Sequence, residues 1–278
     1  MLEKAAAEDF PGRFREIISD PLNLMIRRVP NAGVVSDGMV CLHNGIHVPL
    51  NGSGSYYGDF SQILAINRGV HEPLEEYVFQ QMAEVAPAAP VMLELGAYWG
   101  HYSMWMKRVR PGASVYLVEP ELENIEAGRA NFLRNGIEGN FTQAFVGREH
   151  FRVDQFLCEH KVEHLDILHS DIQGYEMEML ECCTDLLAEA RIGYVFVSTH
   201  SQDLHRDTLE LLGRFNYRVE AASDFDFETT SFDGFVFATA PTVAPVLGKN
   251  FRPLARTDIV HADPRDLIGY LARISSPD

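Results

Sequence analysis

Glu94 and two glycines near the middle of the chain are the residues whose spacing points most clearly to chemistry. They lie in the stretch Val91-Met-Leu-Glu-Leu-Gly-Ala-Tyr-Trp-Gly100, and a second acid, Glu119, ends the next apolar segment. A glycine turn after a strand lets a ligand approach the backbone, and an acid about 20 residues further on can accept hydrogen bonds from ribose hydroxyls. The spacing therefore predicts a nucleoside site at the ends of two neighbouring strands.

Tyr98 indicates which kind of nucleoside such a site would bind. A dinucleotide fingerprint would place glycines at positions 96, 98 and 101, but the chain has Tyr98 and His101 at the last two. Tyr98 would keep the main chain away from a pyrophosphate, and the Glu94 carboxylate would repel one. S-adenosylmethionine carries an ammonium and a sulfonium but no phosphate, so it fits this pattern. A nicotinamide-dependent oxidoreductase is the alternative enzyme, and a non-catalytic cofactor-binding module is a second alternative.

Polar residues also end two later apolar segments. His169 and Asp171 end the segment 165–171, and His200 follows the segment 192–199. In open α/β sheets, ligands bind at the carboxyl ends of the strands, beside the point where the strand order reverses. These side chains are therefore expected to converge with the glycine turn, and this convergence is the main argument for an enzyme.

Asp171 is the first candidate for chemistry on an acceptor hydroxyl. An alcohol that attacks a sulfonium must lose its proton, and a positioned base contributes roughly 10²–10⁴-fold to the rate. His200 is a second candidate base, because histidine titrates near neutrality. The alternatives are structural: Asp171 could cap the helix that follows it, and His200 could bond a neighbouring carbonyl.

His169 stands two residues before Asp171, so both side chains are expected on the same face of one strand. Together with His200 they could form a nitrogen and oxygen site for Mg²⁺ or Mn²⁺, which would acidify the acceptor hydroxyl. The favoured alternative is a polar network that holds the base in place. Glu176 would then support Asp171, or pair with the dipole of the helix that it begins.

Alternating strand and helix patterns from Val91 to about Ala240 must position these residues. Such alternation predicts a largely parallel sheet covered by helices on both faces. The expected strands are residues 91–95, 114–118, 140–145, 165–171, 192–199, 217–221 and 235–239. The expected helices are residues 99–109, residues 121–135 and a segment that begins at Tyr175.

A linker, Ala86-Pro-Ala-Ala-Pro90, separates this region from a different first part of the chain. That first part should contain a hairpin that turns at Asn44-Gly45 and a helix that begins at Pro73 and ends near Val85. A short helix is expected near the C-terminus, at about 264–273. The expected regions are an N-terminal accessory region (1–86), an S-adenosylmethionine-binding domain (87–240) and a C-terminal extension (241–278).

Composition and charge argue against several classes of partner. The 278 residues include 40 acidic and 23 basic side chains, for a net charge of -17. This charge disfavours nonspecific contact with nucleic acid or an anionic membrane. The chain has no apolar segment of the roughly 20 residues that span a bilayer, and its N-terminus does not resemble a signal peptide. Its 4 cysteines lack disulfide-framework spacing, so a cytoplasmic protein is expected.

Three motifs resemble those of the FkbM family of S-adenosylmethionine-dependent methyltransferases. Glu94-Leu-Gly-Ala-Tyr-Trp-Gly-His-Tyr-Ser103 is similar to the family's D-x-G-A-N-x-G-x-Y-S, and Glu119-Pro120 to its E-P. His169-Ser-Asp-Ile-Gln-Gly-Tyr-Glu176 is similar to its K-x-D-x-E-G-x-E. The resemblance covers about residues 91–240. It implies a Rossmann-like class I methyltransferase sheet, mostly parallel with its final strand antiparallel, and methyl transfer, usually to a hydroxyl oxygen.

The resemblance and the strand-end argument together give an expected site. Tyr98, His169 and Gln173 depart from the family's usual asparagine, lysine and glutamate, and these departures bear mostly on the acceptor. The residues expected to bind S-adenosylmethionine are Glu94, Gly96, Ala97, Tyr98, Gly100, Tyr102, Ser103, Glu119, Pro120, Asn124, Ala144 and Asp171. Those expected to contact a small-molecule or glycan hydroxyl are His71, Glu72, Gln173, Glu176 and Asp233, with Asp171, His200 and His169 in catalysis. Tyr56 and Tyr57 could stack on a sugar or ring acceptor.

Overall fold

A seven-stranded sheet forms the centre of the computed structural model, which describes residues 4–52, 54–249 and 251–275. Its strands run in the order β6-β5-β4-β7-β8-β10-β9. The first five pair in parallel, whereas β10 is antiparallel to both of its neighbours. The predicted α/β class I methyltransferase sheet is therefore confirmed. The strands are β4 (Val91–Leu95), β5 (Ser114–Glu119), β6 (Asn140–Gln143), β7 (Leu165–Ser170), β8 (Ile192–Thr199), β9 (Arg218–Ser223) and β10 (Gly234–Thr239).

The third predicted strand is shorter than expected. β6 ends at Gln143, two residues before the predicted end. After it the chain leaves the sheet and pairs with itself, since the Phe151 amide donates to the Phe145 carbonyl at 2.9 Å. This turn carries Phe145 and Val146 toward the cavity described below.

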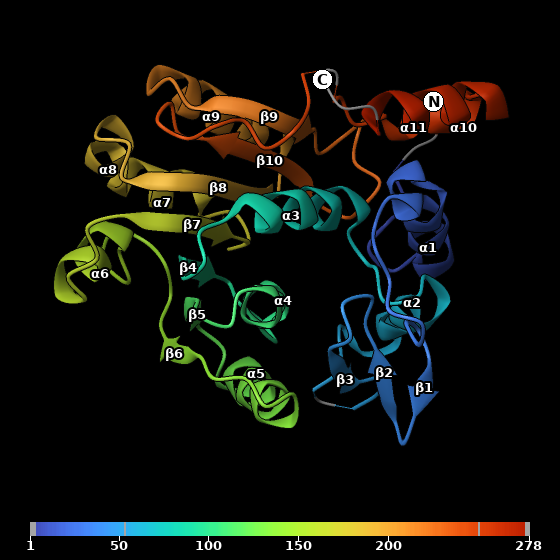
Figure 1. Cartoon of the computed structure of the whole chain (residues 1–278), viewed down its shortest axis with the longest axis horizontal. Helices are drawn as coiled ribbons and strands as arrows, with labels where there is room; N and C mark the ends of the chain where they lie inside the picture. Colours follow the sequence, from blue (N-terminus) through green and yellow to red (C-terminus); the bar gives the residue numbers. More distant parts are fainter. Residues whose placement is uncertain (1–3, 53, 250, 276–278) are drawn as a thin grey trace.

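Alternating side chains of the strands build two apolar layers, one on each face of the sheet. Met92 and Phe196 point into one layer, and their neighbours Leu93 and Val195 point into the other. The first layer lies against α3 (Pro73–Val85), α4 (His101–Val109) and α5 (Leu122–Arg134). The second lies against α6 (Val153–Glu159), α7 (Glu176–Cys182), α8 (Thr184–Ala188) and α9 (Gln202–Arg214). Figure 1 shows α3 and α4 on the side of the sheet that faces the blue N-terminal elements.

The predicted hairpin of the accessory region is confirmed, and a third strand extends it. β2 (Met39–Cys41) pairs with β3 (His47–Pro49), and β1 (Val35–Ser36) pairs with the other edge of β2. Gly45 makes the turn with φ 82°. α3 begins at Pro73, as predicted. The remaining elements of this region are α1 (Phe10–Ser19), η1 (Pro21–Leu24), η2 (Gly58–Ser61) and α2 (Gln62–Ile66).

The C-terminal segment ends in two helices, α10 (Arg256–His261) and α11 (Pro264–Ile274), of which the second was predicted. Tyr270 and Phe251 are buried in the apolar layer that also holds α3 and the hairpin. This layer therefore receives side chains from all three expected regions of the chain. In the described part of the chain, no helix combines the length and the apolar character needed to cross a membrane.

Candidate active site

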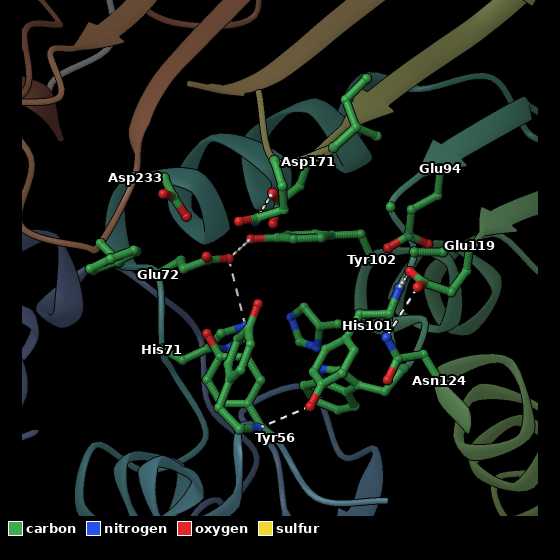
Figure 2. Close-up of a pocket in the computed structure, with 18 of the residues that line it drawn as sticks. Tyr56, His71, Glu72, Glu94, His101, Tyr102, Glu119, Asn124, Asp171 and Asp233 are labelled. Carbon is green, nitrogen blue, oxygen red and sulfur yellow. Dashed lines mark hydrogen bonds and ion pairs between the residues drawn. The ribbon is translucent and has the colours of Figure 1, made fainter. Parts of the chain in front are cut away.

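A cavity of about 750 Å³ lies at the carboxyl ends of β4, β5 and β7 (Figure 2). This is the edge where ligands bind in open α/β sheets. The accessory region and the loop before β10 form the opposite wall. That wall includes Phe10, Arg13, Tyr56, Tyr57, His71, Glu72, Phe232 and Asp233.

Most of the predicted site residues line this cavity. They are Glu94, Gly96, Ala97, Tyr98, Tyr102, Glu119, Pro120, Asn124, Asp171, His169, His71, Glu72, Gln173 and Asp233. The predicted residues that are not among its lining are Gly100, Ser103, Ala144, Glu176 and His200. The contacts of each of these five give the reason.

Glu119 is held with its carboxylate fixed at the end of β5. Its Oε2 accepts a hydrogen bond from the Tyr98 amide at 3.0 Å. Its Oε1 accepts from the Glu121 amide at 3.1 Å and from Nδ2 of Asn124 at 3.0 Å. A carboxylate offers about four acceptor positions, so one stays available for a hydroxyl of a ligand. Figure 2 shows Glu119 and Asn124 at one end of the cavity.

Glu94 reaches the same cavity from the middle of the sheet. Its side chain is 3% exposed, and burial raises its pKa. Its Oε2 accepts from the Ser103 amide at 3.0 Å. Ser103 was expected to bind the cofactor, but it is fully buried in the first turn of α4 and does not line the cavity. It contacts Glu94, which does line the cavity.

The two motif glycines allow the chain to approach itself, and of the two only Gly96 also lines the cavity. Gly96 has φ +69°, and a Cβ there would lie 1.7 Å from the carbonyl oxygen of Asp171. Gly100 has φ +79°, and a Cβ there would lie 2.7 Å from the ring of Phe132. The amides of Gly96 and Ala97 donate to the Val118 carbonyl at 2.9 and 3.1 Å. These amides are therefore not arranged to receive a pyrophosphate.

Ala144 was expected to contact S-adenosylmethionine, but it does not line the cavity. Its amide donates to the Glu119 carbonyl at 3.2 Å, which keeps it at the sheet edge. Phe145 and Val146 line the cavity instead.

Tyr98 connects the glycine turn to the accessory region. Its hydroxyl donates to the Ser55 carbonyl at 3.1 Å and accepts from the Tyr57 amide at 3.0 Å. The Tyr57 ring stacks on the Tyr98 ring with centroids 5.0 Å apart. The aromatic tip of the Gly-Ser loop thereby becomes part of the cavity wall.

His200 lies beside Asp171, as its place at a strand end predicted. It is protonated, however, and so is not suited to act as a base. Its Nε2 is 3.0 Å from Oδ1 of Asp171 and 3.5 Å from Oδ1 of Asp233, and its Nδ1 is 2.8 Å from Oε1 of Glu176. Burial acts to lower the pKa of His200, but the three carboxylates outweigh burial and raise the pKa to about 11. A ring that is protonated at neutral pH cannot accept a proton from an alcohol.

Asp233 is the third member of the cluster with Asp171 and His200. The sequence had suggested His169 for this position. Burial, followed by repulsion from Asp171, raises the pKa of Asp233. One ligand atom from each of Asp171, His200 and Asp233 lies within 4.8 Å of the others, which is close enough to hold a metal ion.

His169 faces away from that cluster. Its Nε2 lies 2.6 Å from Oε1 of Glu75, and its ring packs on Tyr102 with centroids 4.3 Å apart. β7 ends at Ser170, so the alternation of faces does not extend to Asp171. His169 therefore does not join Asp171 and His200 in the metal site that the sequence left open as the less favoured alternative.

Glu176 was predicted to contact the acceptor, but it does not line the cavity. It supports the turn after β7 instead. It is fully buried, and its Oε1 accepts from the Ile172 amide at 3.2 Å and the Gly174 amide at 3.3 Å. Gln173 does reach the cavity, with φ +53°. Its Nε2 donates to Oδ1 of Asp171 at 3.0 Å.

Two acids lie at the start of α3: the half-buried Glu72 just before the helix and the buried Glu75 in its first turn. Tyr102 donates its hydroxyl hydrogen to Oε2 of Glu72 at 2.9 Å. Burial and the neighbouring Glu75 raise the pKa of Glu72 to about 8, and burial and Asp171 raise the pKa of Glu75 to about 8. Glu75 was not predicted as a site residue, since an acid in a first helical turn is expected to face solvent and the helix dipole.

A family model described as the methyltransferase FkbM domain matches residues 141–219. Over this segment the chain is therefore similar to an FkbM methyltransferase domain. The matched segment contains Asp171, Gln173, Glu176 and His200, whereas the Glu94 and Glu119 motifs precede it. The FkbM domain and the order of the sheet support an S-adenosylmethionine-dependent methyltransferase.

Solved structures that are similar to the chain include several methyltransferases, and no curated protein matches it. Precorrin-6y C5,15-methyltransferase from Geobacter metallireducens shares 14% identity over 58% of this chain and 84% of that chain, with a TM-score of 0.43. TrmK from M. capricolum, in complex with S-adenosylhomocysteine, shares 11% identity over 70% and 81%, with a TM-score of 0.40. Methyltransferase FkbM from Methylobacillus flagellatus shares 16% identity over 67% and 56%, with a TM-score of 0.41.

Proposed function

We propose that the chain is an S-adenosylmethionine-dependent O-methyltransferase that acts on a hydroxyl group of a small molecule or a sugar. The observation that carries this proposal is the pair of carboxylates, Asp171 and Asp233, that flank Nε2 of His200 at the cavity edge. A hydroxyl nucleophile needs a proton acceptor, and this pair supplies one.

Glu119 and Asn124 would hold the ribose end of the cofactor, and Glu94 would lie near its ammonium group. A volume of about 750 Å³ is within the range of about 300–1,000 Å³ that is typical of ligand pockets. When bound there, S-adenosylmethionine would supply a methyl group on a positively charged sulfur. The carboxylates of Glu94 and Glu119 favour such a cation. The Gly96 and Ala97 amides already donate to Val118, which disfavours binding of a dinucleotide pyrophosphate.

The acceptor would lie between Asp171, Asp233 and Glu72. Its hydroxyl proton passes to the Asp233 carboxylate, whose raised pKa makes it the better matched base. His200 and Gln173 hold the Asp171 carboxylate in place, and His200 offsets the charge of the pair. His200 is thus a positioning residue.

The lining of the cavity favours a neutral acceptor that is rich in hydroxyl groups. Among the described residues that line it, Arg13 is the only lysine or arginine, whereas its carboxylates are Glu72, Glu94, Glu119, Glu121, Asp171 and Asp233. Carboxylates accept hydrogen bonds from hydroxyls and repel anions. Tyr56 and Tyr57 offer aromatic faces for a sugar ring.

Calorimetric titration with S-adenosylmethionine and with S-adenosylhomocysteine tests the first half of the proposal. We expect one molecule of either compound to bind per chain, and binding of neither would overturn the proposal. The second half is tested by release of S-adenosylhomocysteine in the presence of neutral sugars and phenols. Turnover with amines but not with any hydroxyl compound would reject O-methylation while keeping methyl transfer.

A further inference from the structure

A second cluster of titratable side chains lies behind the cavity, where three elements meet. His43 follows β2 in the hairpin, Glu76 lies in α3, and His101 is the first residue of α4. The three residues are 1%, 0% and 4% exposed. One ligand atom from each lies within 4.8 Å of the others. None of them takes part in the proposed methyl transfer.

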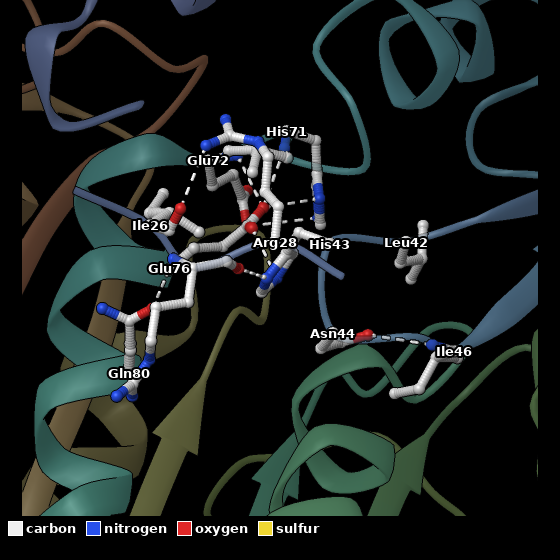
Figure 3. A network of polar contacts seen from close by, with 12 residues as sticks. Ile26, Arg28, Leu42, His43, Asn44, Ile46, His71, Glu72, Glu76 and Gln80 are labelled. Carbon is white, nitrogen blue, oxygen red and sulfur yellow. Dashed lines mark hydrogen bonds and ion pairs between the residues drawn. The ribbon is translucent and has the colours of Figure 1, made fainter. Parts of the chain in front are cut away.

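Glu76 is the centre of this cluster (Figure 3). Its Oε1 accepts from the His71 amide at 2.8 Å and from the Glu72 amide at 3.1 Å, and it lies 2.8 Å from Nδ1 of His71. Its Oε2 is directed at Nε2 of His43, 2.9 Å away. One oxygen is thus used by the loop before α3, and the other lies beside His43.

All three members have a buried polar atom without a hydrogen-bond partner among the described residues, and His101 has two. Among the described residues, neither of its ring nitrogens has a hydrogen-bond partner, although both are buried. Its neighbours are other rings, with centroids 4.8 Å away at His71 and 5.4 Å at Trp99. A buried polar group without a partner is costly, and a ligand for it is therefore expected.

We propose that His43, Glu76 and His101 bind one Zn²⁺ ion. Two imidazole nitrogens and one carboxylate oxygen are a common donor set for zinc. With bonds of about 2.0–2.1 Å, neighbouring ligand atoms in a tetrahedral site lie about 3.3 Å apart, so small side-chain rotations from the observed positions are enough. His101 also lines the cavity, which provides the entry path.

The positive charge of Arg28 would repel this ion. Its Nη1 donates to the carbonyls of Asn23 and Ile26, and its positive charge acts on the Glu76 carboxylate. The ion would join the hairpin, α3 and α4, and would fix the His71-Glu72 loop that forms the acceptor wall.

The test is competitive titration of the full chain with Zn²⁺ against a chromophoric chelator, after removal of metal by EDTA. We expect one Zn²⁺ per chain and a higher melting temperature. His43→Gln and His101→Gln should weaken binding by more than about 100-fold, because even outer-shell partners are worth roughly 10–100-fold. His47→Gln, which changes an exposed histidine of the same hairpin, should leave binding unchanged.

X-ray absorption of the wild-type zinc complex decides the matter if the variants do not fold. Two imidazole ligands support the proposed site, whereas one imidazole indicates the Asp171, His200 and Asp233 cluster. Failure of the wild-type chain to bind one Zn²⁺ overturns the proposal. So does loss of binding in Asp233→Asn together with its retention in His101→Gln. None of these outcomes depends on methyl transfer.

Discussion

Nε2 of His200 lies 3.0 Å from Oδ1 of Asp171, and the two side chains form an ion pair at the edge of the cavity. Glu176 binds the other ring nitrogen at 2.8 Å, so the imidazole is oriented from both sides. A histidine in this position has a carboxylate beside each of its ring nitrogens. Its expected function is to orient Asp171 and to stabilise negative charge there, and the role of proton acceptor passes to the carboxylates.

Replacement of Asp171 by asparagine should separate catalysis from cofactor binding. The amide keeps the shape of the side chain but cannot pair with a charged His200, and it removes the repulsion that helps to raise the pKa of Asp233, the proposed base. We expect kcat to fall by roughly 10²-fold, the lower end of the range for loss of a base, with affinity for S-adenosylhomocysteine nearly unchanged. Single-turnover kinetics and calorimetry measure the two quantities. Asp203→Asn, an exposed acid at the start of α9, is the matched control. If Asp171→Asn lowered kcat and the affinity for S-adenosylhomocysteine to the same extent, Asp171 would have a purely structural role.

The pH dependence of the rate should follow a carboxyl group with a raised pKa. Asp233 accepts a proton only when it is ionised, so activity should decrease as the pH falls through its raised pKa. His200, with its pKa raised to about 11, stays protonated across this range. The acid limb of the profile should therefore remain in His200→Gln and disappear in Asp233→Asn, each at its own reduced rate. Nitrogen NMR of His200 that showed a neutral ring at neutral pH would contradict this assignment.

Much of the sheet and of the cofactor end could be predicted because the signals are local. Strand alternation and the glycine turn specify where a strand ends, and the parallel arrangement then brings Glu94, Glu119 and Asp171 to one edge. The charge state of His200 could not be predicted, since it depends on carboxylates from three different elements. The acid that replaces His169 in the cluster, Asp233, comes from a loop whose position is set by packing against the accessory region.

The proposed zinc ligands could not be predicted from the sequence either, because they come from three separate elements. His43 and His101 lie 58 positions apart in the sequence, and no spacing rule connects them with Glu76. The pair Glu75-Glu76 follows Pro73 and resembles an ordinary acidic helix start. Only the packing of α3 between the hairpin and the sheet turns these side chains inward.

Glu119→Gln should weaken cofactor binding. Glutamine can still accept from the Tyr98 amide, but its amide nitrogen would face the donors of Glu121 and Asn124 and could not accept from a ribose hydroxyl. A hydrogen bond to a charged group contributes about 1.5–3 kcal/mol, so we expect roughly 10- to 100-fold weaker binding by calorimetry. Glu123→Gln, an exposed acid in the first turn of α5, is the control. If both variants weakened cofactor binding equally, the effect would come from the loss of negative charge alone. Glu119 would then not be assigned to the ribose.

Gly96→Ala should be far more destabilising than Gly136→Ala. Both glycines have positive φ, +69° and +65°, so both substitutions carry the same backbone cost of about 1–2 kcal/mol. A Cβ at position 136 meets nothing within 4 Å, whereas one at position 96 meets the Asp171 carbonyl oxygen. We expect an additional loss of roughly 1–3 kcal/mol for Gly96→Ala in urea unfolding, and reduced activity from displacement of Asp171. Equal stability of the two variants would mean that the two strand ends separate easily.

The last prediction concerns Asp20, a buried acid between α1 and η1. Its Oδ1 accepts from the Leu22 amide at 2.8 Å, and its Oδ2 accepts from the Thr230 hydroxyl at 2.6 Å. Burial raises its pKa to about 6 against the opposing effect of these bonds. The folded chain therefore holds this proton more tightly than the unfolded chain. The stability that results is fully present below the unfolded pKa of 3.8 and is lost as the pH rises through about 6.

Asp20→Asn removes this titration, and asparagine keeps the acceptor for the Leu22 amide. The variant should gain stability relative to the wild type as the pH rises, by roughly 1–2 kcal/mol between about pH 5 and pH 8. Urea unfolding at both pH values measures the difference, and the pH dependence that Glu72 and Glu75 contribute to both proteins cancels. A constant difference between the two proteins would mean that Asp20 remains ionised in the folded chain. In that case the Thr230 and Leu22 bonds, and not burial, would control its proton.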